Sequence, residues 1–67
     1  MLIPVYKFGK WSGCQADVFK EDNGFYAYIY GGGCKAKSTR FYKNVEKLKD
    51  ELRDRGFYMI KNYGGNM

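Results

Sequence analysis

The sequence predicts an α+β fold: a small antiparallel sheet of four or five strands with one helix packed on one face, in the order β-β-β-β-α-β. An Asn23-Gly24 dipeptide separates two alternating runs, which is typical of a β-hairpin. Val45, Leu48 and Leu52 recur at three- and four-residue spacing, as on one stripe of a helix. The chain has 67 residues, enough for one hydrophobic core, so we expect a single domain over residues 1–67.

The hairpin sorts its side chains onto two faces, because successive residues of a strand point to opposite sides of a sheet. One face carries small and apolar side chains that suit an interior, namely Ala16, Val18, Phe25, Ala27 and Ile29. The other face is aromatic and acidic and is a candidate for contact with a partner. With Asn23-Gly24 as a two-residue turn, the pairs expected on it are Glu21 with Tyr26, Phe19 with Tyr28, and Asp17 with Tyr30. A three-residue turn would shift this pairing by one residue.

One strand is expected before the hairpin. The stretch Leu2–Trp11 has Pro4 near its start, which favours an edge position or the point where the chain joins the sheet. Ser12-Gly13 then indicates a turn into the hairpin.

Two strands are expected after the hairpin. The triple glycine at 31–33 allows a bulge or a wide, mobile loop, and Lys35–Tyr42 resumes the alternation as a third hairpin-connected strand. Phe57–Lys61 is predicted to be the last short strand, and a frayed tail is expected from about Tyr63.

The helix between them has clear boundaries. Asn44 is a good N-cap, Glu46 lies in the first turn, and Gly56 supplies the C-terminal stop. Glu51 precedes Arg55 by four residues, the favourable order for an ion pair. The apolar stripe is narrow, so the helix is expected to cover one side of the sheet.

The two cysteines flank the hairpin. The expected pairing places Cys14 opposite Gly33, so Cys34 is one residue away and a disulfide is geometrically feasible. Met1–Val5 lacks the basic region of a signal peptide, and no run of 18 apolar residues could span a bilayer. We therefore expect a cytoplasmic protein that does not engage a membrane, in which both thiols are free and buried.

The composition argues against an enzyme, a metal site and a cofactor. The chain has no histidine, the commonest general base and metal ligand, and two cysteines cannot complete a structural zinc site. The glycine run that precedes Lys35 lacks the second glycine and the Ser or Thr of a phosphate-binding P-loop. It remains open whether this run forms a backbone nest for one phosphate or a plain flexible connection.

Charge and aromatic content favour a binding module. The net charge is +5 and aromatic residues make up 19% of the chain, seven of them Tyr. Such a balance favours polyanionic partners or acidic protein surfaces, although solubility alone also explains it. Our leading hypothesis is a non-enzymatic nucleic-acid-binding accessory or regulatory module, with phosphates on basic residues and bases stacked on rings. The basic candidates are Lys35, Lys37, Arg40 and Lys43, with Lys7, Lys10 and Lys20 at the margins; the aromatic candidates are Phe19, Tyr26, Tyr28 and Tyr30.

A protein partner is the alternative. Asp17 and Glu21 share the aromatic face and would repel phosphates, so this face could instead serve a small inhibitor or adaptor that binds a host or partner protein. A third reading gives these rings no partner: they only shield the second face of the sheet beneath a terminal segment. The sequence does not predict the oligomeric state.

The order of elements over Gln15–Gly56 resembles known DNA-binding domains. From Ser38 to Leu52 a strand ends in Phe41 and a helix begins a few residues later. This arrangement is similar to the three-stranded domains of the AP2 type and to the arm-binding domains of integrases. The resemblance implies that an exposed sheet face reads a DNA groove through Lys35, Lys37 and Arg40. The small size and the Tyr and Lys content also resemble accessory proteins of bacteriophages.

Overall fold

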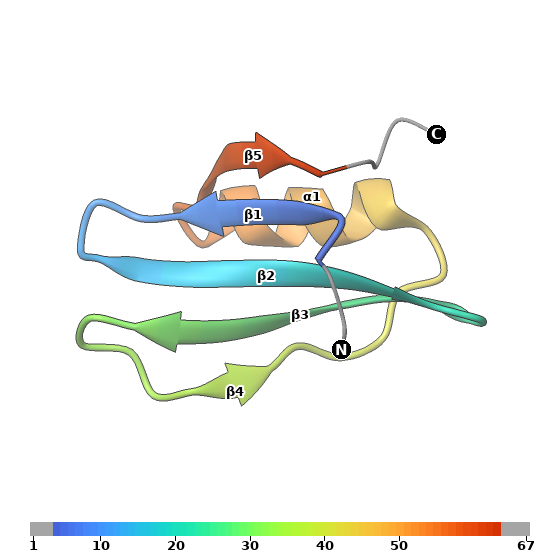
Figure 1. The fold of residues 1–67 in the computed structure, drawn as a ribbon, viewed down its shortest axis with the longest axis horizontal. Coiled ribbons are helices and arrows are strands. Elements are labelled where there is room, and N and C mark those ends of the chain that lie inside the picture. The colour runs from blue at the N-terminus through green and yellow to red at the C-terminus, as the bar shows by residue number, and fades with distance from the viewer. Residues whose placement is uncertain (1–3, 64–67) are drawn as a thin grey trace.

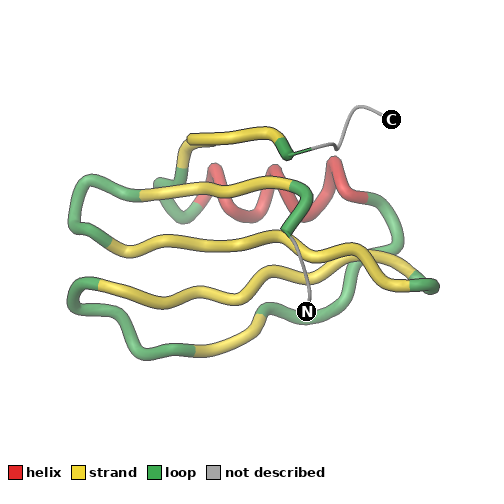
Figure 2. Tube along the Cα trace, in the orientation of Figure 1, coloured by secondary structure: helices red, strands yellow, loops and turns green. Residues whose placement is uncertain are grey.

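A computed structural model describes residues 4–63 and shows a five-stranded antiparallel sheet with one helix on one face (Figure 1). The predicted α+β class and the order β-β-β-β-α-β are confirmed. The strands lie in the order β4-β3-β2-β1-β5, and Figure 2 shows how much of the chain they occupy. The elements are β1 (Tyr6–Gly9), β2 (Cys14–Glu21), β3 (Gly24–Gly31), β4 (Lys37–Ser38), α1 (Val45–Asp54) and β5 (Tyr58–Asn62).

Strand β1 lies inside the sheet, between β2 and β5, so of the two positions suggested by Pro4 the edge position is wrong and the entry of the chain into the sheet is observed. Pro4 precedes the strand, where its missing N–H costs no ladder hydrogen bond. The C-terminal strand takes the position at the edge, and the backbone N–H of Tyr63 donates to the carbonyl oxygen of Val5 at 2.9 Å. The remainder of the predicted tail, residues 64–67, lies outside the described residues.

The β2–β3 hairpin forms as predicted, but its turn is Asp22-Asn23 and Glu21 pairs with Gly24. The predicted cross-strand pairs are therefore displaced by two residues, and an even displacement leaves the two faces unchanged. Within residues 4–63 no non-glycine residue has a positive φ, whereas an Asn23-Gly24 turn of type I′ would need one at Asn23. The pairs observed on the aromatic face are Phe19 with Tyr26, Asp17 with Tyr28, and Gln15 with Tyr30.

The strand predicted over Lys35–Tyr42 is much shorter, and beyond it a side chain makes one of the hydrogen bonds to β3. Only β4, Lys37–Ser38, pairs regularly with β3. At the next position the Thr39 hydroxyl accepts the N–H of Ala27 at 3.0 Å and donates to the carbonyl of Arg40. The chain rejoins β3 in a single bridge between Phe25 and Tyr42.

The helix α1 has the predicted N-cap and stop. The Asn44 side chain accepts the N–H of Glu46 at 2.8 Å, and Gly56, with φ of 94°, follows the C-cap Arg55. The apolar stripe packs on the inner face of the sheet, where four of the five predicted interior residues are buried and Phe25 packs at the margin. The buried core comprises Tyr6, Phe8, Cys14, Ala16, Val18, Ala27, Ile29, Leu48, Leu52 and Phe57.

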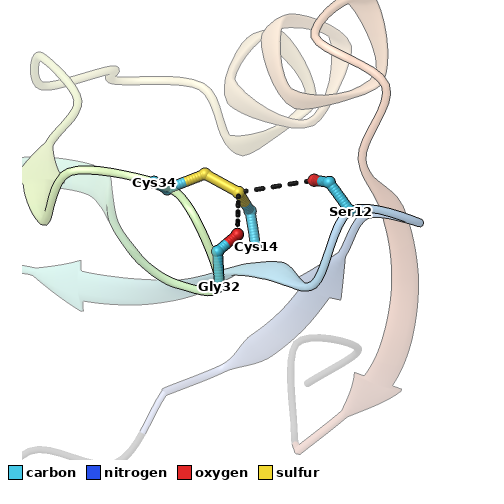
Figure 3. The surroundings of a disulfide bond; sticks show 4 residues. All are labelled: Ser12, Cys14, Gly32 and Cys34. Atoms are coloured by element: carbon cyan, nitrogen blue, oxygen red, sulfur yellow. Dashed lines mark hydrogen bonds between the residues drawn. A yellow bond between two sulfur atoms is a disulfide. The ribbon is translucent and has the colours of Figure 1, made fainter.

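The cysteines form a disulfide, so the prediction of two free thiols is wrong (Figure 3). The turn at Asp22-Asn23 brings Gly31 opposite Cys14, and the N–H of Cys34 donates to the carbonyl of Gly31 at 2.8 Å. The glycine turn that this hydrogen bond closes places the Cα of Cys34 5.8 Å from that of Cys14, a separation typical of disulfides. The triple glycine therefore forms a tight turn anchored to the start of β2. Over the described part of the chain, no helix has the length and apolar character needed to cross a bilayer.

Candidate functional site

A groove lies on the helix side of the sheet, between α1 and the β4 edge. In Figure 1 the helix is seen behind β1, between β5 and β2. Two adjoining hollows of about 370 and 350 Å³ share Ile29, Lys37 and Arg55 in their walls. We call them together the basic groove. Its charged lining residues are Lys10, Lys35, Lys37, Arg40, Arg55 and Glu51.

The cations of the basic groove come from three separate elements. Lys37 belongs to β4, Lys35 and Arg40 flank that strand, and Arg55 is the C-cap of α1. Lys10 reaches the groove from the β1–β2 turn, with its Nζ 5.2 Å from the ring centroid of Phe57. Five cations thus line the two adjoining hollows of the basic groove, together with a single carboxylate, an arrangement that favours an anionic ligand.

The carboxylate of the groove, Glu51, interacts with other residues that line it. Glu51 accepts a hydrogen bond from Nε of Arg55 at 2.7 Å, which lowers the pKa of Glu51, with further contributions from Tyr42 and Arg40. The Arg40 guanidinium lies 5.2 Å from the ring centroid of Tyr42, and a hydrogen bond with the Tyr42 hydroxyl raises the pKa of Arg40. The guanidinium groups of Arg55 and Arg40 are therefore positioned by contacts within the protein.

Three of the four predicted basic contacts line the groove, and Lys43 does not. Lys10, expected only at the margin, belongs to the groove, and Arg55 was predicted only as an ion-pair partner of Glu51. The signal that could have identified Arg55 is its place at the helix C-terminus, where a cation is favoured and the chain turns back to the sheet.

The aromatic candidates lie on the opposite side of the sheet, which we call the outer face. Residues 4–63 place no helix or strand over it, and it faces the viewer in Figure 1. The Tyr26 ring stacks with Phe19 at 5.5 Å and with Phe41 at 6.0 Å, and Tyr28 stacks with Tyr30 at 6.0 Å. Phe41, which the prediction of the site omitted, is 48% exposed and Tyr28 is 40% exposed.

An ion pair neutralises part of this face. Lys7 lies 3.2 Å from Asp17, and the Tyr30 hydroxyl accepts a hydrogen bond from Lys7 at 2.7 Å and donates toward Asp17 at 3.1 Å. These contacts, that of Tyr30 foremost, raise the pKa of Lys7 although partial burial opposes the charge. Asp17 is thus paired with Lys7. The other acidic residue of this face, Glu21, is exposed at the end of β2.

The fold therefore separates two groups of residues that the nucleic-acid hypothesis placed on one surface. Lys37 pairs with Ile29 and faces the helix side, whereas Tyr28 pairs with Ser38 and faces outward. The rings of the outer face and the cations of the groove cannot contact one short ligand segment together.

Within residues 4–63 no group of three acidic, Cys or His side chains is placed to hold a metal ion. No protein-family model, no curated protein and no solved structure matches this chain. The resemblance to AP2-type and integrase arm-binding domains stays a prediction.

Proposed function

We propose that this chain is a non-enzymatic nucleic-acid-binding module that holds the phosphate backbone in the basic groove. The observation that carries the proposal is that five cations line the two adjoining hollows of the basic groove: Lys10, Lys35, Lys37, Arg40 and Arg55. Phosphates bind to clusters of Lys and Arg and release counterions, which supplies most of sequence-independent affinity. The net charge of +5 supports the same reading at long range.

A salt titration tests this proposal. Labelled oligonucleotides are titrated with the oxidised protein at low and moderate salt, and binding is followed by fluorescence anisotropy. We expect affinity that falls steeply with salt, because each phosphate contact releases a counterion. Heparin at equal charge serves as the competitor that separates nucleic acid from polyanions in general. No binding at low salt would contradict the proposal.

The outer face gives a second candidate function, a protein-binding inhibitor or adaptor. The observation that favours it is the exposed pair Tyr28 and Phe41 on a face whose Asp17 is already paired with Lys7. Tyrosine-rich patches with little net charge are typical of protein interfaces. A purified partner that binds the natural protein and the Lys37→Glu variant, but neither Tyr28→Ala nor Phe41→Ala, would support this function instead.

The cytoplasmic location stays a prediction. The Cys14–Cys34 disulfide gives a reason to test it, because disulfides persist mainly in oxidising compartments. Alkylation of the protein directly on lysis, followed by mass spectrometry, distinguishes a reducing from an oxidising location. Recovery of the disulfide form indicates an oxidising location, and recovery of alkylated thiols indicates a reducing one.

A further inference from the structure

Trp11 is exposed far beyond any other large apolar residue of the described chain. Its exposed fraction is 95%, whereas the next highest among the large apolar side chains is 52%, at Ile60. Single exposed apolar residues are common. A tryptophan, however, usually stabilises a small domain through the large apolar area that it buries, and Trp11 buries almost none. Trp11 thus contributes nothing evident to the core.

The position of Trp11 connects it to the basic groove. It follows Lys10, a groove cation, and adjacent Cα atoms are about 3.8 Å apart. Figure 1 shows that the β1–β2 turn, the β3–β4 connection and the link from α1 to β5 lie at the same end of the sheet. Trp11 is therefore at the end of the groove where Lys10 and Lys35 enter its wall.

The turn that carries Trp11 is held in place. Its two ends are joined by hydrogen bonds from the N–H of Gly13 to the carbonyl of Lys10 at 3.0 Å, and from the N–H of Lys10 to the carbonyl of Cys14 at 2.9 Å. The disulfide then ties Cys14 to Cys34, itself a residue of the groove wall (Figure 3). Because the backbone of this turn is already fixed, a ligand that stacks on Trp11 has only the side chain left to order.

We propose that Trp11 stacks on one unpaired base of a single-stranded nucleic acid whose phosphates occupy the basic groove. This inference rests on the proposed function and selects its substrate class. Phosphate contacts alone do not separate duplex from single strand, whereas stacking needs a base whose face is free. A strand that meets Lys10 with a phosphate brings the attached base beside Trp11, and an aromatic ring accepts any base on its face.

Trp11 is the only tryptophan of the chain, so its emission reports this one position. Oxidised protein is titrated with oligothymidylate of about eight nucleotides, which falls within the usual site sizes. An abasic strand of equal length and a duplex of equal phosphate content are run beside it. We expect oligothymidylate to bind and quench the emission, the abasic strand to bind more weakly without quenching, and the duplex to bind without quenching.

Two substitutions at the same position sharpen the test. Trp11→Ala should lower affinity for oligothymidylate about fivefold or more, and Trp11→Phe should keep most of it. Both should bind the abasic strand as the natural protein does and melt at an unchanged temperature. Equal affinity of the natural protein and Trp11→Ala for oligothymidylate, with no quenching, would overturn the stacking proposal while leaving the groove intact. If neither oligothymidylate nor the abasic strand binds at low salt, the proposed function itself fails, and Trp11 is then a contact for another class of partner.

Discussion

Lys37 lies directly opposite Ile29 in the β3–β4 ladder, and this pairing directs its side chain to the helix side of the sheet. Its neighbour in the ladder, Ser38, is opposite Tyr28 and shares the outer face with it. A shift of the β3–β4 register by one residue would place Lys37 on the outer face instead. The helix side combines Lys37 with cations from the helix end and the β1–β2 turn, and the outer face keeps the stacked rings.

The disulfide should contribute much of the stability of so small a domain. It joins residues separated by 20 positions, and closing a loop of that size stabilises a fold by about 3 kcal/mol. We expect the Cys14→Ser, Cys34→Ser double variant, and the natural protein in dithiothreitol, to show this loss in urea unfolding followed by circular dichroism. A reduced protein as stable as the oxidised one would contradict the role given to this bond.

Gly24 should be intolerant of a side chain for reasons of space. A Cβ there would collide with the backbone carbonyl of Tyr42, which bridges to Phe25. Because backbone on both sides must move, we expect Gly24→Ala to cost about 3 kcal/mol in urea unfolding. Gly33→Ala is the control: φ is +84° but its Cβ would meet nothing within 4 Å, so about 1 kcal/mol is expected. Equal costs at the two positions would argue against the close approach at Gly24.

Glu51 should make the groove sensitive to acid. The hydrogen bond from Arg55, above all, lowers the pKa of Glu51 in the folded protein. Its stabilising contribution is therefore fully present above the ordinary glutamate pKa of about 4.3 and is lost as the pH falls through the lower folded value. Protonation also removes the negative charge of Glu51 from the groove, so affinity for a phosphate backbone should rise over the same pH range.

Carboxyl NMR titration checks this directly. In the Arg55→Gln variant the pKa of Glu51 should return toward its ordinary value, whereas Arg53→Gln, which removes the cation bound to Asp50, should leave it unchanged. A Glu51 that titrates identically in all three proteins would show that Arg55 does not hold it.

Local patterns in the sequence were sufficient to predict the elements and the two faces of the hairpin. Alternation from Phe25 to Tyr30 needs only the pleat of a strand, and the N-cap Asn44 and stop Gly56 act within one helical turn. The same is true of the Glu51–Arg55 pair. These interactions depend on neighbours along the chain, and each is observed.

Other features depended on contacts between distant segments. The turn is at Asp22-Asn23, and Gly24 after it lies against the backbone of Tyr42, a residue far along the chain. That turn brought Gly31 opposite Cys14 and made the disulfide possible. Likewise, the Thr39 hydroxyl, and not a backbone carbonyl, accepts the N–H of Ala27 where β4 ends.

Three of the five cations that line the groove were among the predicted basic contacts, but the surface that they form was not predicted. Lys35, Lys37 and Arg40 were identified from their charge, and the rings from their parity. Alternation within one strand does not say on which side of the sheet the next strand's basic residues fall, because β4 is short and enters through the glycine turn. The separation of basic and aromatic surfaces therefore emerged only with the β3–β4 register.

The most direct test of the basic groove compares two charge reversals in the same assay. Lys37→Glu changes a residue of the groove, and Lys43→Glu makes the same change at an exposed position outside its lining. Affinity for a labelled single-stranded oligonucleotide is measured across a salt series for both and for the natural protein. The account predicts that Lys37→Glu lowers affinity about tenfold and reduces the salt slope by about 0.7 or more, while Lys43→Glu changes both far less. Equal losses for the two variants would mean that only net charge matters and that the groove does not bind the phosphate backbone.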